Sequence, residues 1–145
     1  MNIAEFSKLR LVGGTSLALQ IGHRKSIDID FFGEIEFDSL SLPEIFADFK
    51  NVNSIKRSKN INIFNIDNVK VDFVNFSYPW LEDVVRYDSI RLARIKDIAA
   101  MKLAAITGRG SRKDFVDLYF LLKKFSLKEI MEMYSAKYFD GSEYL

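Results

Sequence analysis

The sequence predicts an α+β domain in which helices flank a mixed β-sheet and the last third of the chain is helical. Apolar and polar residues alternate in residues 27–32 and 69–76, which is the period of a β-strand. From residue 95 onward, three segments instead repeat their apolar residues at helical spacing. The 145 residues contain no repeat, no low-complexity segment and only two prolines, so we expect a single domain over residues 1–145.

The residue composition excludes several kinds of chemistry. The chain has no cysteine, which excludes disulfides, thiolate zinc sites and a cysteine nucleophile. His23 is its one histidine, which excludes a histidine-rich metal site, and no nucleophile-elbow motif supports a Ser-His-Asp triad. The net charge is +1, so a polyanion has to be bound by a local patch. No apolar run of transmembrane length is present, and residues 1–10 contain no apolar h-region, so we expect a cytoplasmic protein without a membrane partner.

The first predicted elements are a short strand, a glycine turn and a helix. Arg10–Val12 forms the strand, and Gly13-Gly14 ends it. The hydroxyl of Thr15 or Ser16 is expected to cap a helix that runs through residue 21, where Gly22 stops it.

Residues 27–32 are predicted to form the next strand, before a turn at Gly33. Successive side chains of a strand point to opposite faces, so Ile27, Ile29 and Phe31 are expected to face a core. Asp28 and Asp30 then share the other face, with their bases roughly 6–7 Å apart.

The remaining elements are predicted from turn residues and from the change of period. Ser41 and Pro43 open a helix over residues 42–50, and Asp67-Asn68 joins two strands as a tight hairpin. The other predicted elements are strands over Val52–Arg57, Ile61–Ile66 and 69–76, a loop or short strand over 88–94, and helices over 95–107, 112–125 and 127–138.

The turn made by Gly13, Gly14, Thr15 and Ser16 is a candidate phosphate-binding site. Glycines let a backbone approach a ligand closely, and free N–H groups at the following helix start favour an anion. An ordinary strand-to-helix turn explains the same residues. The turn is neither a Walker A loop nor a dinucleotide fingerprint, because no Gly-Lys-Ser/Thr closes it and the G-x-G-x-x-G spacing is absent.

Asp28, Asp30 and Asp72 are candidate metal ligands. Aspartate is depleted in strands, so two in one strand and a third in the middle of residues 69–76 indicate a use. If the two strands are neighbours, three carboxylates line one face and can hold two Mg²⁺ ions. The alternatives are a solvated acidic face for Asp28 and Asp30, and an ion pair with Lys70 for Asp72.

Lys102 lies in the middle of an apolar helical stripe, so it either extends to solvent or meets an anion in a cleft, where it would neutralise phosphate. Ser111 and Asp114 fit a helix capping box. Asp114 and Asp117 are therefore expected to give structural support by holding Lys102 or Arg109 in place.

Two basic segments have alternative interpretations. Arg24 and Lys25 either contact phosphate or pair with the acidic strand. Lys56, Arg57 and Lys59 either meet nucleic acid or lie on a solvated hairpin edge, and the edge is favoured.

Together these residues resemble the nucleotidyltransferase superfamily, in which a Gly-Gly or Gly-Ser helix start precedes an Asp-x-Asp strand and a third, distal acid. More narrowly, the segments GGTSLALQIGHRKSIDIDFF and KLAAITGRGSRKDFVDLYFL are similar to the AbiEii toxin family of nucleotidyltransferase-like proteins. The likeness extends from Val12 to Leu122.

The resemblance implies a role for each matching position. Asp28 and Asp30 match the metal-binding pair, and Asp72 matches the third acid. Lys102 matches a later lysine motif, as a residue that positions the triphosphate. The expected nucleotide-binding residues are Gly13, Gly14, Thr15, Ser16, Arg24 and Asp114, with Asp117 beside them.

The same resemblance implies a Mg²⁺-dependent transfer of a nucleoside monophosphate from an NTP to an acceptor hydroxyl on tRNA or protein. The protein would be the toxin of a toxin–antitoxin or phage-defence system, with a cognate antitoxin as partner. The alternatives are a non-catalytic nucleotide- or partner-binding module of the same fold and a small-molecule nucleotidyltransferase that modifies antibiotics. Many relatives continue into a larger C-terminal helical region, so with the sequence ending at Leu145 we expect acceptor recognition to be reduced or supplied by a partner.

Overall fold

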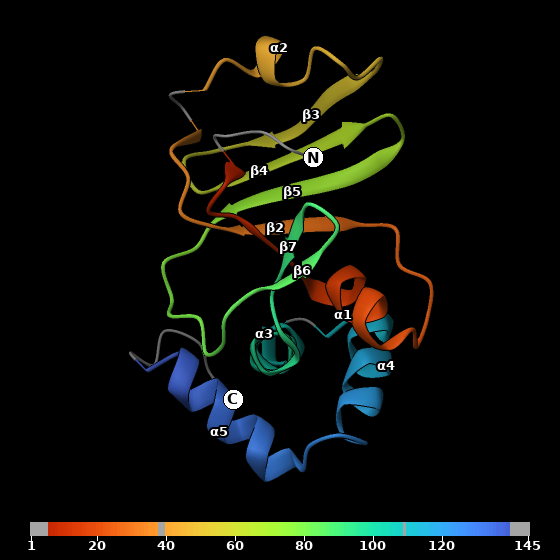
Figure 1. Ribbon diagram of the computed structural model, residues 1–145, viewed down its shortest axis with the longest axis vertical. Helices are drawn as coiled ribbons and strands as arrows, with labels where there is room; N and C mark the ends of the chain where they lie inside the picture. The colour runs from red at the N-terminus through yellow and green to blue at the C-terminus, as the bar shows by residue number, and fades with distance from the viewer. Residues whose placement is uncertain (1–5, 38–39, 109, 140–145) are drawn as a thin grey trace.

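The computed structural model describes residues 6–37, 40–108 and 110–139. Its strands are β1 (Arg10–Val12), β2 (Ile29–Gly33), β3 (Val52–Arg57), β4 (Ile61–Ile66), β5 (Val69–Asn75), β6 (Val85–Tyr87) and β7 (Ile90–Leu92). They form one seven-stranded sheet in the order β3-β4-β5-β2-β1-β7-β6 (Figure 1). β2 and β5 are parallel, as are β1 and β7, and the other neighbours are antiparallel. The predicted α+β class with a mixed sheet is confirmed.

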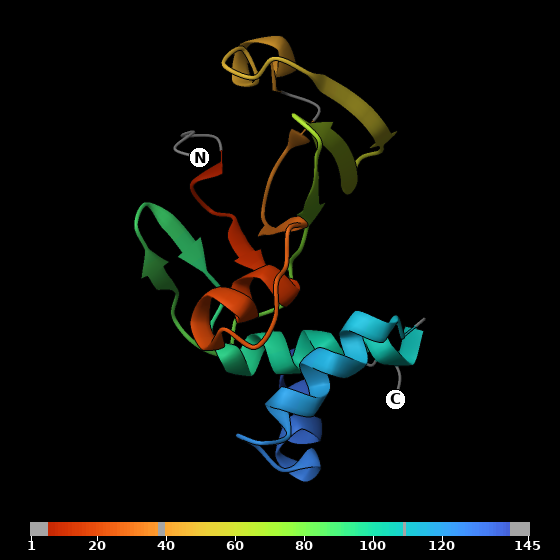
Figure 2. The ribbon, with the colours of Figure 1, turned by 90° about the vertical axis from the view of Figure 1, so that its right-hand side faces the viewer.

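Helices cover the two faces of this sheet unequally. The helices are α1 (Gly13–Ile21), α2 (Leu42–Ile45), α3 (Ile95–Gly108), α4 (Arg112–Leu121) and α5 (Leu127–Lys137). Figure 2 shows α3, α4 and α5 gathered at one end of the molecule, with α1 between them and the sheet, while α2 lies at the opposite end. None of the helices in the described ranges is long and apolar enough to span a membrane.

The two faces of the sheet belong to two separate cores. The aromatic core lies under α2 and the loop before it, and its buried members are Phe6, Leu9, Ile35, Phe37, Phe46, Phe64, Ile66, Val71 and Phe73. The helical core lies between the sheet and α1, α3, α4 and α5, and its buried members are Val12, Leu17, Ala93, Ile98, Ala99, Leu103, Leu121, Ile130, Tyr134 and Tyr138. Strand alternation therefore sends one set of side chains into the aromatic core and the other set toward the helices.

The alternation in β5 has the predicted sense. Val71 and Phe73 are buried in the aromatic core, so Asp72 between them faces the helices. The hairpin between β4 and β5 also forms as predicted, because Asp67 and Asn68 adopt the positive φ values of 49° and 70° that a tight turn requires.

The second strand begins later than the sequence predicts. β2 starts at Ile29, and Ile27 is 73% exposed, not in a core. The segment before Ile29 is held by the start of α1 and not by a strand ladder, since the Thr15 hydroxyl donates to the Asp28 carbonyl oxygen and lies 2.7 Å from the Ser26 hydroxyl. Asp28 therefore precedes the strand, while Ile29 and Phe31 pack against the aromatic core as predicted.

The first helix begins earlier than predicted, at Gly13, and no hydroxyl caps it. Val12 occupies the N-cap position, and Ser16 donates its hydroxyl to the Ala93 carbonyl oxygen at 3.2 Å. Gly22 does stop the helix, with φ +61° and its N–H bonded to the Ala18 carbonyl oxygen at 2.8 Å.

Two helix ends and one short strand also differ from the prediction. α2 ends at Ile45, because Phe46 and Phe49 turn inward to pack against each other in the aromatic core. α4 ends at Leu121, where tighter turns lead to the Ser126 capping box of α5. β6 was not predicted; it pairs with β7 in a hairpin whose turn residue Asp88 has a φ of +54°.

Candidate active site

Parallel pairing of β2 and β5 places two of the predicted carboxylates side by side. Asp30 lies in register with Asp72, and neighbouring strands are about 4.8 Å apart. Both side chains line a cleft of about 440 Å³ between the sheet and α3. Gly13, Lys102 and Asp114 line the same cleft. Residues distant in the sequence thus line one cleft.

Gly13 brings the start of α1 directly onto the Asp30 carboxylate. A Cβ atom at this position would lie 2.8 Å from Asp30 Oδ2, and Gly13 has a φ of +70°. Both observations require glycine here. The glycine turn is therefore next to the acidic pair, with the first turn of α1 at the wall of the cleft.

Asp30 is a carboxylate in an unfavourable environment for its charge. Burial raises its pKa to about 6, and the neighbouring carboxylates of Asp72 and Asp28 contribute in the same direction. Lys70 and Lys102 oppose this rise without cancelling it. A bound cation would relieve both the burial and the repulsion.

Asp72 has the ion-pair partner that the sequence suggested as an alternative. Lys70 Nζ donates to Asp72 Oδ2 at 3.2 Å and lies 3.1 Å from Oδ1 without hydrogen-bond geometry. Oδ1 is buried and accepts no hydrogen bond in the described part of the chain. Because the Lys70 side chain is 45% exposed, water can replace it at low cost.

The donor set of the acidic pair suits a divalent cation. Asp30 and Asp72 offer carboxylate oxygens, which Mg²⁺ prefers, and one of these oxygens is buried without a hydrogen-bond donor. Asp28 acts on the pKa of Asp30 but lies one residue before β2. Within the described ranges, no group of three or more acidic or histidine side chains is arranged to hold a metal ion. The structure thus joins two of the three predicted ligands.

Lys102 meets two carboxylates of its own chain. Its side chain is 8% exposed, and Nζ lies 3.0 Å from Asp114 Oδ1 and 2.9 Å from Asp117 Oδ2. Asp114 also closes the predicted capping box, because its Oδ2 accepts from the Ser111 N–H at 3.0 Å. Both aspartates give the structural support to Lys102 that the sequence predicted, whereas Arg109 lies outside the described residues.

Asp117 is the centre of a buried ion cluster that the sequence did not reveal. Its fully buried carboxylate accepts from Arg24 Nε at 2.7 Å, from Arg24 Nη2 at 3.0 Å and lies 2.6 Å from His23 Nε2. Burial alone would raise the pKa of Asp117, but hydrogen bonds from Arg24, His23 and Lys102 hold it well below its usual range. The three-residue spacing from Asp114 was the one signal that placed Asp117 near the site.

Arg24 therefore pairs with a helix aspartate and not with the acidic strand. Its hydrogen bond to Asp117 raises the pKa of the guanidinium further above its ordinary value. Gly14 makes room for this pair, since a Cβ atom there would lie 1.9 Å from Arg24 Nη2 and 3.1 Å from Asp117 Oδ2. Close approach to a buried ion pair thus explains the second glycine of the turn.

Aromatic side chains form one wall of the cleft. Phe32, Phe76, Tyr78 and Tyr138 line it, with Tyr78 and Tyr138 in an edge-to-face contact at 4.8 Å between ring centroids. Behind them, the buried Lys137 Nζ lies 2.7 Å from Asp97 Oδ1 and 4.2 Å from the centre of the Trp80 ring. No sequence motif indicated this wall, because its members come from β2, from the loop after β5 and from the end of α5.

Solved structures with the same fold include nucleotidyltransferases. A putative nucleotidyltransferase from Helicobacter pylori superimposes with a TM-score of 0.64 at 20% identity, covering 92% of this chain and 73% of that one. ANT(2″)-Ia in complex with adenylyl-2″-tobramycin gives a TM-score of 0.64 at 12% identity, with 89% and 86% covered. The fold is therefore that of the nucleotidyltransferases.

The family follows from the sequence match. Residues 2–141 match the model of the nucleotidyl transferase AbiEii toxin family, described as a type IV toxin–antitoxin system, and the chain belongs to that family. An uncharacterized protein of Aquifex aeolicus (strain VF5) is 42% identical in an alignment of 134 residues that covers 88% of this chain. The match spans 65% of the length of that relative. The resemblance drawn from the sequence motifs is confirmed.

Proposed function

We propose that the chain is a Mg²⁺-dependent nucleotidyltransferase that transfers a nucleoside monophosphate from an NTP to an acceptor hydroxyl. The observation that carries the proposal is the pairing of Asp30 with Asp72 in one cleft, against the glycine start of α1. Two adjacent carboxylates with a raised pKa at Asp30 favour a divalent cation, and a helix start favours phosphate. Family membership supports the same activity.

Asp30 and Asp72 would hold the metal, with Asp28 at the edge of the site. When bound, Mg²⁺ would neutralise the triphosphate and favour the departure of pyrophosphate. The acceptor oxygen forms a bond to the α-phosphorus while the bond from that phosphorus to the bridging oxygen of pyrophosphate breaks. The hydroxyl proton would pass to the carboxylate of Asp72, which lies in register beside Asp30.

The backbone N–H groups at the start of α1 would face the triphosphate, and Thr15 and Ser16 would position that turn through their hydrogen bonds to the Asp28 and Ala93 carbonyls. Lys102 lines the cleft while Asp114 and Asp117 hold its ammonium group. We propose that it contacts phosphate from this fixed position, and that Arg24 acts by fixing Asp117.

A role as the toxin of a cytoplasmic toxin–antitoxin system, with a cognate antitoxin as partner, is part of the proposal because the family is described in those terms. The acceptor is proposed to be tRNA or another RNA, with protein as the alternative. Arrest of growth on expression of the wild-type chain in a bacterial host, absent with Asp30→Asn, is the expected behaviour of such a toxin.

The test is transfer of label from each of the four α-labelled NTPs to total cellular RNA or protein in the presence of Mg²⁺. We expect Asp30→Asn to lower labelling by at least about a hundredfold, since it removes charge that acts in the transition state. Asp48→Asn is the matched control, because Asp48 is an exposed turn residue and the chemical change is identical. Equal labelling by Asp30→Asn and wild type would refute the proposal, and NTP binding without any labelling would favour the non-catalytic module.

A further inference from the structure

Three arginines form a row across the sheet outside the catalytic cleft. Leu11 of β1 pairs with Leu92 of β7 in parallel, which puts Arg10 beside Arg91. Arg91 lies directly opposite Arg86 of β6. Side chains at matching positions of neighbouring strands point to the same face, so the three guanidinium groups share one face. We call Arg10, Arg91 and Arg86 the arginine row.

The charges of the arginine row have no ion-pair partner within the described ranges of the chain. Like charges directly opposite each other destabilise a sheet, so the arrangement has a cost unless an anion occupies it. Asp97 and Asp83 act on Arg10 only from a distance, and Asp97 is paired with Lys137. Burial, and then the charge of Arg91, lower the pKa of Arg10.

A hollow of about 330 Å³ lies against the row. Its cationic lining is Lys8, Arg10 and Arg91, and its aromatic lining is Phe76, Tyr78 and Trp80. Glu34 also lines it, 3.8 Å from the exposed Lys8 ammonium group. The hollow therefore combines positive charge with flat aromatic surface.

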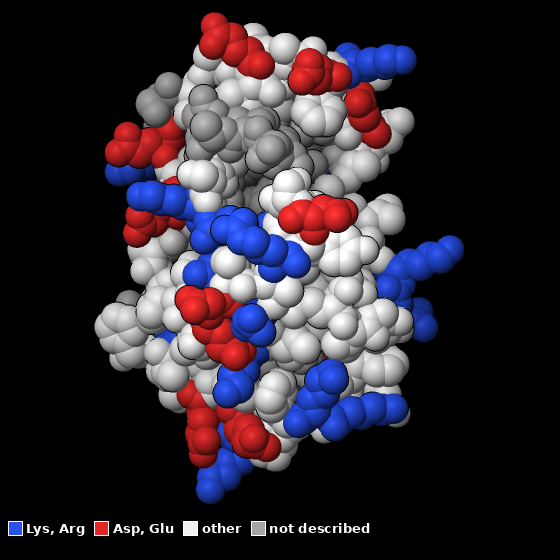
Figure 3. All heavy atoms as spheres, in the orientation of Figure 1, with Lys and Arg blue, Asp and Glu red and all other residues white. Residues whose placement is uncertain are grey.

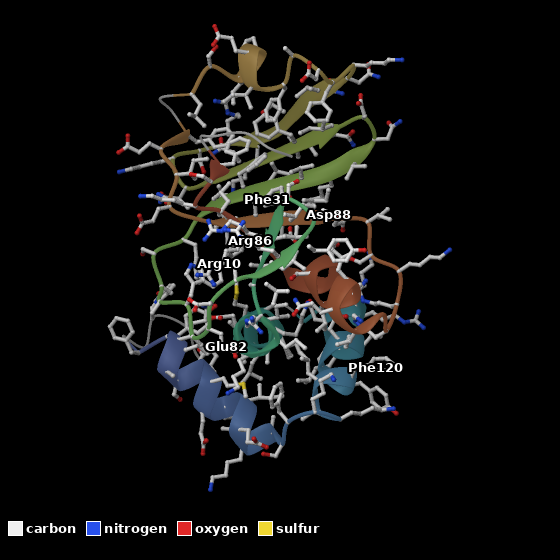
Figure 4. The ribbon with its side chains drawn as sticks, viewed as in Figure 1. Arg10, Phe31, Glu82, Arg86, Asp88 and Phe120 are labelled. Carbon is white, nitrogen blue, oxygen red and sulfur yellow. The ribbon has the colours of Figure 1, made fainter. Side chains whose placement is uncertain are left out.

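Fixed orientation distinguishes Arg10 and Arg91 from ordinary surface cations. Arg10 Nη1 donates to the Glu82 carbonyl oxygen at 2.8 Å and its guanidinium stacks over Trp80 at 4.4 Å. Arg91 Nη1 donates to the Ser7 carbonyl oxygen, while its buried Nε has no hydrogen-bond acceptor in the described residues. Arg86 is exposed. In Figure 4, Arg10 and Arg86 lie above Glu82, and the strand pairing places Arg91 between them; Figure 3 shows basic atoms crossing the middle of this face.

The hollow adjoins the catalytic cleft. Phe76 and Tyr78 line both, so the two sites share an aromatic border. A chain molecule that is bound along the arginine row can therefore reach Asp30 and Asp72 with its end. The positive charges of the arginine row lie on the far side of the aromatic wall, so a free nucleotide in the cleft does not contact them.

We propose that the arginine row and its hollow bind the phosphodiester backbone of a single-stranded nucleic acid. Guanidinium groups bind phosphate through paired N–H donors, and Tyr78, at the border of the hollow, places an aromatic ring where a base of the same strand can stack. One consequence of this binding rests on the proposed function: the bound strand presents its terminal hydroxyl to the cleft. Binding itself does not depend on turnover.

Fluorescence anisotropy with a labelled twelve-nucleotide single-stranded RNA tests the proposal on the full chain without NTP. Arg86→Glu is expected to weaken binding by about tenfold or more at low salt and to lower the slope of log K against log salt by about 1. Lys128→Glu on α5 is the matched control, because it makes the same charge change at an exposed position and is expected to alter binding less than twofold.

Two further arms separate this inference from the proposed function and from other anions. Asp30→Asn is expected to bind the RNA at least as well as the wild type even where it no longer transfers label. Inorganic phosphate at the concentration of RNA phosphate is expected to displace little RNA. Equal binding by Arg86→Glu and Lys128→Glu, or binding to anionic phospholipid vesicles in place of RNA, would overturn the proposal whether or not the chain transfers nucleotides.

Discussion

At positions 13 and 14, the absence of a side chain determines how the site is assembled. Gly13 allows the helix start to touch Asp30, and Gly14 allows the Arg24–Asp117 ion pair to lie against the same helix. Two adjacent glycines therefore serve two different carboxylates, one in the cleft and one in the buried cluster. The glycine motif of the sequence indicated close approach to a ligand, and the close approach observed is to the side chains of the chain itself.

Gly14→Ala is expected to destabilise the protein by about 1–3 kcal/mol, because the new methyl group overlaps the Arg24 guanidinium, which two hydrogen bonds to the buried Asp117 hold in place. The change in free energy of unfolding can be measured by urea denaturation. Gly108→Ala is the control, since a Cβ atom there meets nothing within 4 Å and the residue is helical. If both variants unfold at the same urea concentration, Gly14 is not needed for the ion pair.

At the scale of elements, the buried pair of Lys137 and Asp97 fixes the end of α5 to the start of α3. Asp97 also accepts from the backbone N–H groups of Leu81 and Glu82, at 2.9 and 3.1 Å. Lys137 donates to the Pro79 carbonyl oxygen at 2.8 Å as well. One ion pair thus connects two helices and the loop that carries Tyr78 and Trp80, so the aromatic wall of the cleft depends on it.

Lys137→Met is expected to lower the free energy of unfolding by about 3–5 kcal/mol, because it leaves the buried Asp97 carboxylate without its cation. The loss should appear in urea denaturation together with faster hydrogen exchange in α5 and in residues 79–82. Lys128→Met on the same helix is exposed and should change stability by less than about 0.5 kcal/mol. Unchanged exchange in residues 79–82 would mean that the pair does not fix the loop.

The sequence was informative about elements with strong local signals and about residues with regular spacing. The strands around Asp30 and Asp72 and the long helix of Lys102 were predicted because their periods are clear. The start of β2 was misplaced because Thr15 fixes the Asp28 carbonyl from another element. β6 is three residues long and was missed for lack of any period. Likewise, Asp117 bonds to His23 and Arg24, which lie 94 and 93 residues earlier in the chain. No local sequence pattern indicates such a contact.

At the scale of the whole molecule, the acidic pair of Asp30 and Asp72 lowers the stability of the fold at neutral pH, although the same two carboxylates form the candidate metal site. A carboxyl group whose pKa rises from 3.8 to about 6 on folding binds more protons in the native state between those pH values. Stability is therefore higher at acid pH and is lost as the pH rises from about 4 to about 6. Burial of Asp30 is the largest cause of this rise in pKa, and the carboxylates of Asp72 and Asp28 add to it. The charges of Lys70 and Lys102 oppose it. Asp114 and Asp117 have lowered pKa values and act in the opposite direction at lower pH.

Asp30→Asn is accordingly expected to be more stable than the wild type at pH 7.5, by about 1–3 kcal/mol, and this advantage should vanish near pH 4. Urea denaturation at both pH values measures the difference. Mg²⁺ at a hundred times its Kd should stabilise the wild type by about 2.7 kcal/mol, which offsets most or all of this difference, without affecting the variant. Asp48→Asn should follow the wild type throughout. A wild type that is no less stable than Asp30→Asn at pH 7.5 without Mg²⁺ would show that the Asp30 charge is compensated within the fold, and the acidic pair would then have no need of a cation.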